Sequence, residues 1–233
     1  MVTKSSSPAR NQRRRAAGNR HDNRDVRVGI WVVQSIPDGR RIPLLGDLRH
    51  EHFYFTEGDP LVDHAEYDAP PVTTTLGSGE EAVGFDAIVH FVDGRTECRR
   101  VSARPLDPSN EASKTLLDRY QAAARRRGGV FVEITPGVLD RAQTRIWNWV
   151  RVVGAYHRAH EHSLALAEAG LQAAVSDGRV HCIGQILDTL HLYPPALVLA
   201  AIAKHLRLRL LSSDLDSATW SRNTELRAVG ATS

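Results

Sequence analysis

The chain has 233 residues, 42% of them apolar and 24% charged, which is typical of a globular protein that buries its own core. No apolar run approaches the roughly 20 residues that a membrane span needs, and the N-terminus lacks the apolar core of a signal peptide, so we expect a cytoplasmic protein with no membrane contact. The two cysteines, Cys98 and Cys182, are far apart in sequence. This spacing predicts neither a disulfide framework nor a cysteine-based zinc site.

Positive charge is concentrated in the first 24 residues, where seven basic residues accompany one acidic residue. The segment therefore carries +6 within a total of +3, and the remainder carries −3. Because it has very few apolar residues to bury, we predict a disordered basic arm over residues 1–25. Such an arm can bind phosphates, with Arg13, Arg14 and Arg15 as DNA-binding candidates, or it is a solvated tail with no specific target.

After the arm, the apolar patterns predict short strands and one helix. Asp47 is a plausible N-cap for the helix, and Gly58 is a plausible stop. Asp93-Gly94 is a turn signal that predicts a hairpin. The predicted elements in this part are a strand at 26–33, the helix at 47–58, extended pieces at 61–67 and 70–76, and the hairpin at 83–103.

The clearest helix follows at 109–129, with Ser109 as its expected cap and a Gly-Gly stop, and a buried strand is predicted at 130–135. Helical pattern then runs from Val138 with little interruption. A hairpin followed by strands that alternate with helices predicts an α/β layer with a mixed sheet. From about residue 179, small helical segments precede a weak hairpin, which is the pattern of a winged-helix module.

The order of these features from about Val26 to Val229 resembles the TnsA-type endonuclease subunit of heteromeric bacterial transposases. Four segments carry the resemblance: 59–70 for an acidic D-P-x-V followed by Q-P, 84–95 for the P-D-F strand, 128–139 for the strand that ends in v-T-e, and 212–229 for the end of a winged helix. Gly84 stands where that strand has its proline.

The resemblance implies a restriction-endonuclease-like domain over 26–158, with a mixed sheet flanked by helices, and a winged-helix-like domain over 159–233. It also implies Mg²⁺ or Mn²⁺ as the cofactor. The implied partners are transposon-end DNA, a transposase subunit of the integrase-like class and an AAA+ ATPase regulator, in the bacterial cytoplasm at the nucleoid.

The sequence departs from the family at the residues that carry the chemistry. Family nucleases hold their metals with a helix Glu, a strand Asp and an acidic or Gln residue two positions before a Lys. Here Asp86 keeps the strand position, whereas Arg49 takes the helix position, and Arg100 and Ser102 take the last two. A guanidinium repels a divalent cation and stays protonated, so we expect the nuclease site to be lost.

The register of the 83–103 hairpin decides which acidic groups accompany Asp86. A three-residue loop with Gly94 in the left-handed conformation places Asp86 opposite Arg100. A two-residue turn shifts the strand pairing by one residue and places Glu97 on the same side of the sheet as Asp86. An active nuclease with relocated ligands, Asp86 and Glu97 with Glu51 as a third candidate, is then the alternative. Hydrophobicity favours this second register, since it keeps Glu97 and its neighbours away from the apolar face of the first strand.

Other segments allow both a structural and a functional interpretation. Lys204, Arg207 and Arg209 lie near the expected wing and are candidates for DNA backbone contact. The stretch 147–158 interleaves tryptophans with arginines, which suits nucleic-acid stacking, although aromatic residues at helical spacing are more often core. Histidines at 157–162 are closely spaced but more typical of a surface cluster than of a zinc site.

We therefore expect a TnsA-like component of a DNA transposition machinery that binds transposon ends or the transposase, with its metal-dependent cleavage lost. Two alternatives remain: the active Mg²⁺-dependent endonuclease with relocated ligands, and a protein-interaction module with no role in nucleic-acid binding.

Overall fold

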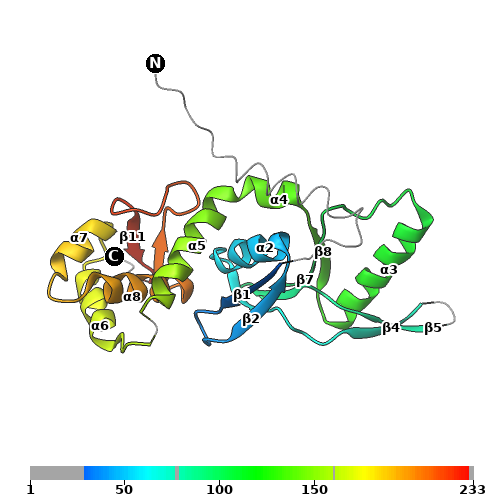
Figure 1. Cartoon of the computed structure of the whole chain (residues 1–233), viewed down its shortest axis with the longest axis horizontal. Coiled ribbons are helices and arrows are strands. Elements are labelled where there is room, and N and C mark those ends of the chain that lie inside the picture. Colours follow the sequence, from blue (N-terminus) through cyan, green and yellow to red (C-terminus); the bar gives the residue numbers. More distant parts are fainter. Residues whose placement is uncertain (1–28, 77–78, 160, 231–233) are drawn as a thin grey trace, which may run out of the picture.

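The computed structural model describes residues 29–76, 79–159 and 161–230. The predicted basic arm, with Arg13, Arg14 and Arg15, lies outside the described residues. Figure 1 shows two lobes on either side of helix α5 (Gln143–His157), an N-terminal lobe that precedes this helix and a C-terminal lobe that follows it. No helix within the described ranges combines the length and the apolar character that a membrane crossing requires.

A mixed four-stranded sheet is the centre of the N-terminal lobe. Its order is β3 (Val62–Glu66), β6 (Ala87–Phe91), β7 (Thr96–Val101) and β8 (Val130–Ile134). The first three strands are antiparallel neighbours, and β8 runs parallel to β7. Parallel neighbours need a crossover connection, which helix α3 (Glu111–Arg126) supplies. The predicted α/β class with a mixed sheet is confirmed.

Helices cover both faces of this sheet. Helix α2 (Asp47–Glu57) lies on the face to which Arg99 of β7 points, since Arg99 donates to Thr56 of that helix. Helix α3 lies on the other face, where Cys98 packs with Ala124. The alternation of side chains along β7 therefore separates two environments, one on the α2 face and one on the α3 face.

Two ribbons extend the lobe. One pairs β1 (Ile30–Gln34) with β2 (Arg41–Leu45), and the other pairs β4 (Val72–Leu76) with β5 (Gly79–Val83). The sequence patterns predicted β1 and β4 approximately but not β5, whose Gly-Glu-Glu start has little strand character.

Helix ends differ from the prediction in small ways. Helix α3 begins one residue later than expected, because the side chain of Asn110 rather than Ser109 accepts from the backbone N–H groups of Ala112 and Ser113. The nearly continuous helix predicted after Val138 is divided into three helices. These are α4 (Pro136–Arg141), α5, and α6 (Ala165–Ala174).

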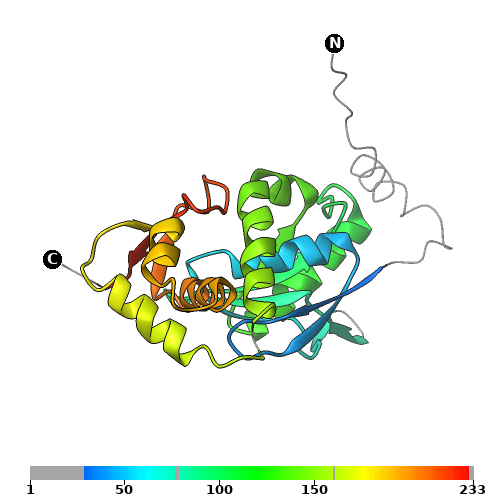
Figure 2. The same cartoon turned by 60° about the vertical axis from the view of Figure 1, so that its left-hand side comes forward.

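The C-terminal lobe contains the small helices and the closing hairpin that the sequence predicted, and a third strand, β9, that it did not predict. After α6 come β9 (His181–Cys182), α7 (Ile183–Thr189), α8 (Pro195–Arg207), β10 (Leu211–Ser213) and β11 (Glu225–Ala228). The three strands form an antiparallel sheet in the order β10-β11-β9. Helix α8 packs against α5, α6 and β10, and Figure 2 shows it beside α5.

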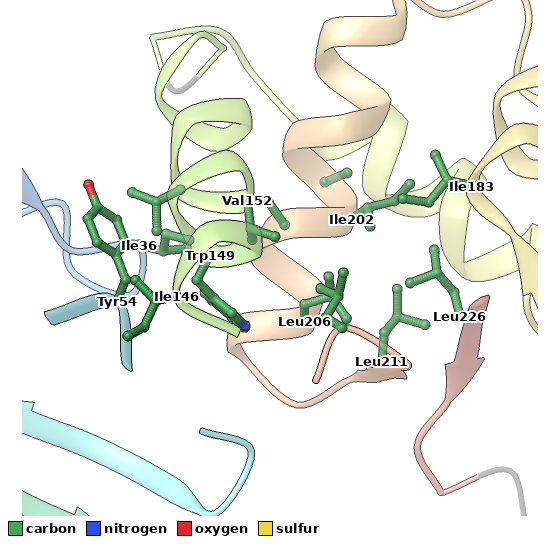
Figure 3. Close-up of a cluster of buried hydrophobic side chains, with 14 of the residues drawn as sticks. Ile36, Tyr54, Ile146, Trp149, Val152, Ile183, Ile202, Leu206, Leu211 and Leu226 are labelled. Carbon is green, nitrogen blue, oxygen red and sulfur yellow. The ribbon is translucent and has the colours of Figure 1, made fainter. Parts of the chain in front are cut away.

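One apolar core runs through both lobes. Trp149 and Val152 of α5 are buried between residues of the N-terminal lobe, such as Tyr54, and residues of α8, such as Ile202 and Leu206 (Figure 3). Most of α8 is buried, from Val198 to Arg207 with few interruptions. The lobes are therefore packed as one body, and α8 serves as an internal helix.

Candidate functional site

The hairpin adopts the three-residue loop. Phe91 N–H donates to Arg95 O at 2.9 Å, and Gly94 has a φ of +85°. Strands β6 and β7 pair Ala87 with Arg99 and Val89 with Glu97. The prediction of a two-residue turn, which hydrophobicity favoured, is therefore wrong.

The carboxylate of Asp86 is bound on both oxygens. One oxygen accepts from Nε of Arg49, and the other accepts from Val101 N–H at 2.6 Å. Asp86 itself precedes β6, and its N–H donates to Arg99 O although Ala87 is the residue paired with Arg99. Asp86 and Ala87 therefore both lie opposite Arg99, as in a β-bulge, and the Asp86 side chain contacts Arg49 of helix α2.

Arg49 takes the position in which a cation would have to lie. Its guanidinium contacts Asp86 through Nε and donates from Nη1 to Leu45 O at 3.0 Å. An arginine at this position already compensates the negative charge of the carboxylate and repels a divalent ion. The residues around Asp86 therefore do not fit Mg²⁺ or Mn²⁺.

Arg100 and Ser102 stand at the other two positions where the sequence departs from the TnsA-type pattern, and each contacts residues other than Asp86. Arg100 forms an ion pair with Glu133 of β8 and lies over the ring of Tyr120, on the α3 face of the sheet. Ser102 donates its hydroxyl to Arg104 O at 2.6 Å. Arg100 therefore pairs with Glu133 and not with Asp86, although the hairpin register was expected to place it opposite Asp86.

Glu97 belongs to a separate buried network on the α2 face. Its two oxygens accept from Arg95 at 2.7 Å and from Arg99 at 2.8 Å. Arg99 is only 3% exposed and also donates to Thr56 at 3.0 Å. Both oxygens of the Glu97 carboxylate therefore accept hydrogen bonds from arginines.

Asp86 and Glu97 do not form a common metal site. Within the described ranges, the groups of three or more His, Cys, Asp or Glu residues that approach closely enough to hold an ion include neither of them. Glu51, the third residue of the relocated-ligand alternative, is half-buried on α2. Asp86 and Glu97 each have an arginine partner instead.

His52 is the most perturbed group beside this network. It is buried on α2, its Nε2 lies 3.2 Å from the hydroxyl of Thr56, and the Arg99 guanidinium is at 3.5 Å. Burial, followed by the charges of Arg99 and Arg49, lowers the pKa of His52 from 6.5 to about 3. His52 is therefore neutral at physiological pH and acts as a buried hydrogen-bonding group.

The three basic residues proposed for DNA contact near the wing have partners inside the protein. Arg207 is buried and donates to Glu57 at 2.6 Å, and Arg209 donates to Asp63 at 2.7 Å. Lys204 pairs with Glu168 at 2.6 Å. Arg207 cannot reach a DNA backbone without leaving a buried carboxylate unpaired, so we do not retain it as a DNA contact.

Helix α5, unlike α8, has basic and aromatic side chains that are exposed to solvent. Trp149 is core, as the structural interpretation predicted, whereas Trp147 is 50% exposed. Arg151 and Arg158 are exposed. Arg151 follows Trp147 by four residues and Arg158 follows Arg151 by seven, so all three lie on one side of the helix. The ion pairs that arginines form within the described ranges include neither Arg151 nor Arg158. We call Trp147, Arg151 and Arg158 the α5 stripe.

Sequence reasoning missed a second cluster, which consists of His64, Glu66 and His90 on neighbouring strands β3 and β6. His64 and Glu66 are two apart in a short extended segment, a spacing that places both on one face of a strand. The third member depends on the pairing of β3 with β6, which no local pattern reveals.

Comparison with known proteins does not assign a family. No protein-family model matches the chain, and a search of curated proteins finds no significant match. The functional argument therefore depends on the residues described above.

Proposed function

We propose that the chain is a TnsA-like component of a DNA transposition machinery that binds DNA at transposon ends and has no metal-dependent nuclease activity. The observation that carries the loss of cleavage is the Arg49–Asp86 ion pair, because it places a fixed cation against the one carboxylate that keeps its family position. Loss of cleavage leaves DNA binding and partner binding as the remaining roles.

Two features of the fold support the family assignment. A mixed sheet between α2 and α3, with the last strand parallel, is compatible with a restriction-endonuclease-like domain. The succession of α6, β9, α7, α8 and the β10–β11 hairpin is compatible with a winged helix. The burial of α8 argues that this module packs against α5 rather than inserting the helix into a DNA groove.

DNA contact is better assigned to the α5 stripe. It offers two exposed guanidinium groups and one exposed indole, and residues 141–159 contain no acidic residue. Arginines bind phosphates, and an exposed tryptophan can stack on a base. By resemblance, an integrase-class transposase and an AAA+ regulator would act beside the bound end.

Fluorescence anisotropy with a labelled duplex from the end of the element that carries the gene tests DNA binding. We expect affinity to fall steeply with salt, and the Arg151→Ala/Arg158→Ala variant to bind more weakly with a salt slope reduced by up to about 2. Arg179→Ala is the matched control, since Arg179 is 83% exposed and lies away from the stripe. Binding that does not change with salt and is unchanged in the Arg151→Ala/Arg158→Ala variant would contradict the proposal.

A second assay tests the loss of cleavage. Supercoiled plasmid incubated with the protein and Mg²⁺ or Mn²⁺ should stay intact. Nicking that disappears in Asp86→Ala would mean that the site still works as a nuclease, and the relocated-ligand alternative would replace the proposal.

A further inference from the structure

His64, Glu66 and His90 lie together on one face of the sheet. His64 of β3 is paired directly with His90 of β6, and Glu66 follows His64 by two residues, so the three side chains point the same way. One potential ligand atom of each residue lies within 4.8 Å of the other two. The described part of the chain has no second group of three His, Cys, Asp or Glu residues with this property.

Both imidazoles are oriented by a hydrogen bond at Nδ1. Nδ1 of His64 is 3.0 Å from a carboxylate oxygen of Asp63, and Nδ1 of His90 is 3.1 Å from the hydroxyl of Thr96. This leaves Nε2 of each ring for a ligand. Metal-binding histidines commonly donate their other N–H to a carboxylate or another acceptor, which fixes the tautomer and the orientation of the ring.

The spacing of the side chains suits a small tetrahedral ion. Ligand atoms bound to Zn²⁺ at about 2.0–2.1 Å lie about 3.4 Å apart in a tetrahedral site. Nε2 of His90 is already 3.3 Å from Oε1 of Glu66, and the rings of His64 and His90 are stacked with centroids 4.3 Å apart. The three candidate ligand atoms lie within 4.8 Å of one another, so the partly exposed His64 and Glu66 side chains would have to move them closer together around an ion.

The surroundings also suit an ion that exchanges with solvent. The side chains of His64 and Glu66 are 57% and 44% exposed, which leaves an entry path and room for water at a fourth position. Cys98, on the same face, is fully buried, and burial raises the pKa of its thiol, so it offers no thiolate to the site.

We propose that His64, Glu66 and His90 form a Zn²⁺-binding site with one open coordination position. The ion would connect β3, the edge strand of the sheet, to β6. Arg209 of the C-terminal lobe donates to Val62 O at 3.0 Å and to Asp63 at 2.7 Å, immediately beside the site. Zinc would therefore stabilise the strand to which the C-terminal lobe is attached, whether or not the protein binds DNA.

Calorimetric titration of ZnCl₂ into chelator-treated, full-length protein tests the site. We expect one ion per chain, with an affinity that falls by more than about 100-fold in His64→Ala and in His90→Ala, because each removes a ligand. Thr96→Val removes only the hydrogen bond to Nδ1 of His90 and should weaken binding by about 10-fold. His162→Ala, which removes an exposed histidine elsewhere, should bind as the wild type does.

Thermal unfolding and Co²⁺ substitution separate binding from folding defects. His64→Ala and His90→Ala should melt with the wild type in chelator. Zinc at about 100 times the wild-type dissociation constant should raise the Tm of the wild type and of His162→Ala by about 5 °C and leave the Tm of these two variants unchanged. Bound Co²⁺ should give the visible absorption of a tetrahedral site, lost in Glu66→Gln. No zinc binding by the wild type, or binding that is lost in His162→Ala but kept in His64→Ala and His90→Ala, would overturn the proposal.

Discussion

Arg207, the last residue of α8, donates through Nε to Oε2 of Glu57, the last residue of α2, at 2.6 Å. The two side chains are 5% and 3% exposed and come from different lobes. The hydroxyl of Tyr67 donates to the other oxygen of Glu57 at 3.1 Å, and burial together with the Glu57 charge raises the pKa of Tyr67 well above its ordinary value. The lobes are therefore joined by a buried ion pair as well as by the apolar core.

Removing the arginine of this pair should be strongly destabilising. Arg207→Met leaves the Glu57 carboxylate buried without a cation, which we expect to cost about 3–5 kcal/mol of unfolding free energy. Urea denaturation followed by circular dichroism measures the change. Arg179→Met, at an exposed pair with Asp177, should leave the urea midpoint unchanged.

The double variant Glu57→Met/Arg207→Met tests whether the two residues act together. With both charges removed, the loss should be clearly smaller than the sum of the two single losses. Additive losses would mean that Arg207 stabilises the protein through packing alone.

Local sequence patterns predicted the elements better than the contacts between them. The helix at 47–58, the hairpin at Asp93-Gly94 and the mixed sheet followed from turn signals and apolar periodicity, which act over a few residues. The pairings Arg49–Asp86 and Arg100–Glu133 join residues more than 30 positions apart and depend on the tertiary fold. No local pattern predicts them.

The hairpin register shows why hydrophobicity alone misled. The apolar pattern argued against placing Arg99 beside the apolar face of β6. Arg99 is nevertheless buried there, because its guanidinium donates hydrogen bonds to Glu97 and Thr56. A buried arginine is acceptable where carboxylate and hydroxyl partners surround it. Those partners include a residue of α2, so the cost of burial could not be judged from the two strands.

Gly94 should be the most sensitive glycine of the hairpin. Its φ of +85° is unfavourable for residues with a side chain, although open space surrounds the position. We expect Gly94→Ala to lower the unfolding free energy by about 1–2 kcal/mol. Gly84→Ala is the control, since Gly84 also faces open space but lacks a positive φ, and its midpoint should barely move. Equal effects would show that the loop does not require the left-handed conformation.

His52 should make stability depend on pH in the mildly acidic range. Its pKa is about 3 in the folded protein, against an ordinary value of 6.5 that we take for the unfolded chain. Between pH 6.5 and pH 3, His52 is therefore protonated in the unfolded chain and neutral in the folded protein. The contribution is fully present above pH 6.5 and is lost at about 1.4 kcal/mol per pH unit as the pH falls toward 3.

His52→Gln should remove this dependence, because glutamine keeps a hydrogen-bonding group and takes up no proton. Unfolding free energies measured between pH 5 and 6.5 should fall less steeply for the variant, by up to about 1.4 kcal/mol per pH unit. Burial also lowers the pKa values of His50 and His205, so a smaller slope of the same sign should remain. Identical slopes for the two proteins would contradict the assignment of this effect to His52.

Charge reversal at Arg49 tests whether its guanidinium takes the role of a metal ion at Asp86. Arg49→Glu removes the guanidinium and sets a second carboxylate against Asp86, which favours binding of a divalent cation. Without metal, the variant should lose about 1 kcal/mol or less, since the Arg49 side chain is 38% exposed and the pair is partly screened. Mn²⁺ should then raise the Tm of Arg49→Glu and leave the wild-type Tm unchanged.

Arg49→Gln is the control for this prediction, because it loses the arginine without gaining a carboxylate. Its Tm should not respond to Mn²⁺. A wild-type Tm that rises with Mn²⁺ and ceases to do so in Asp86→Ala would instead mean that Asp86 binds metal despite Arg49.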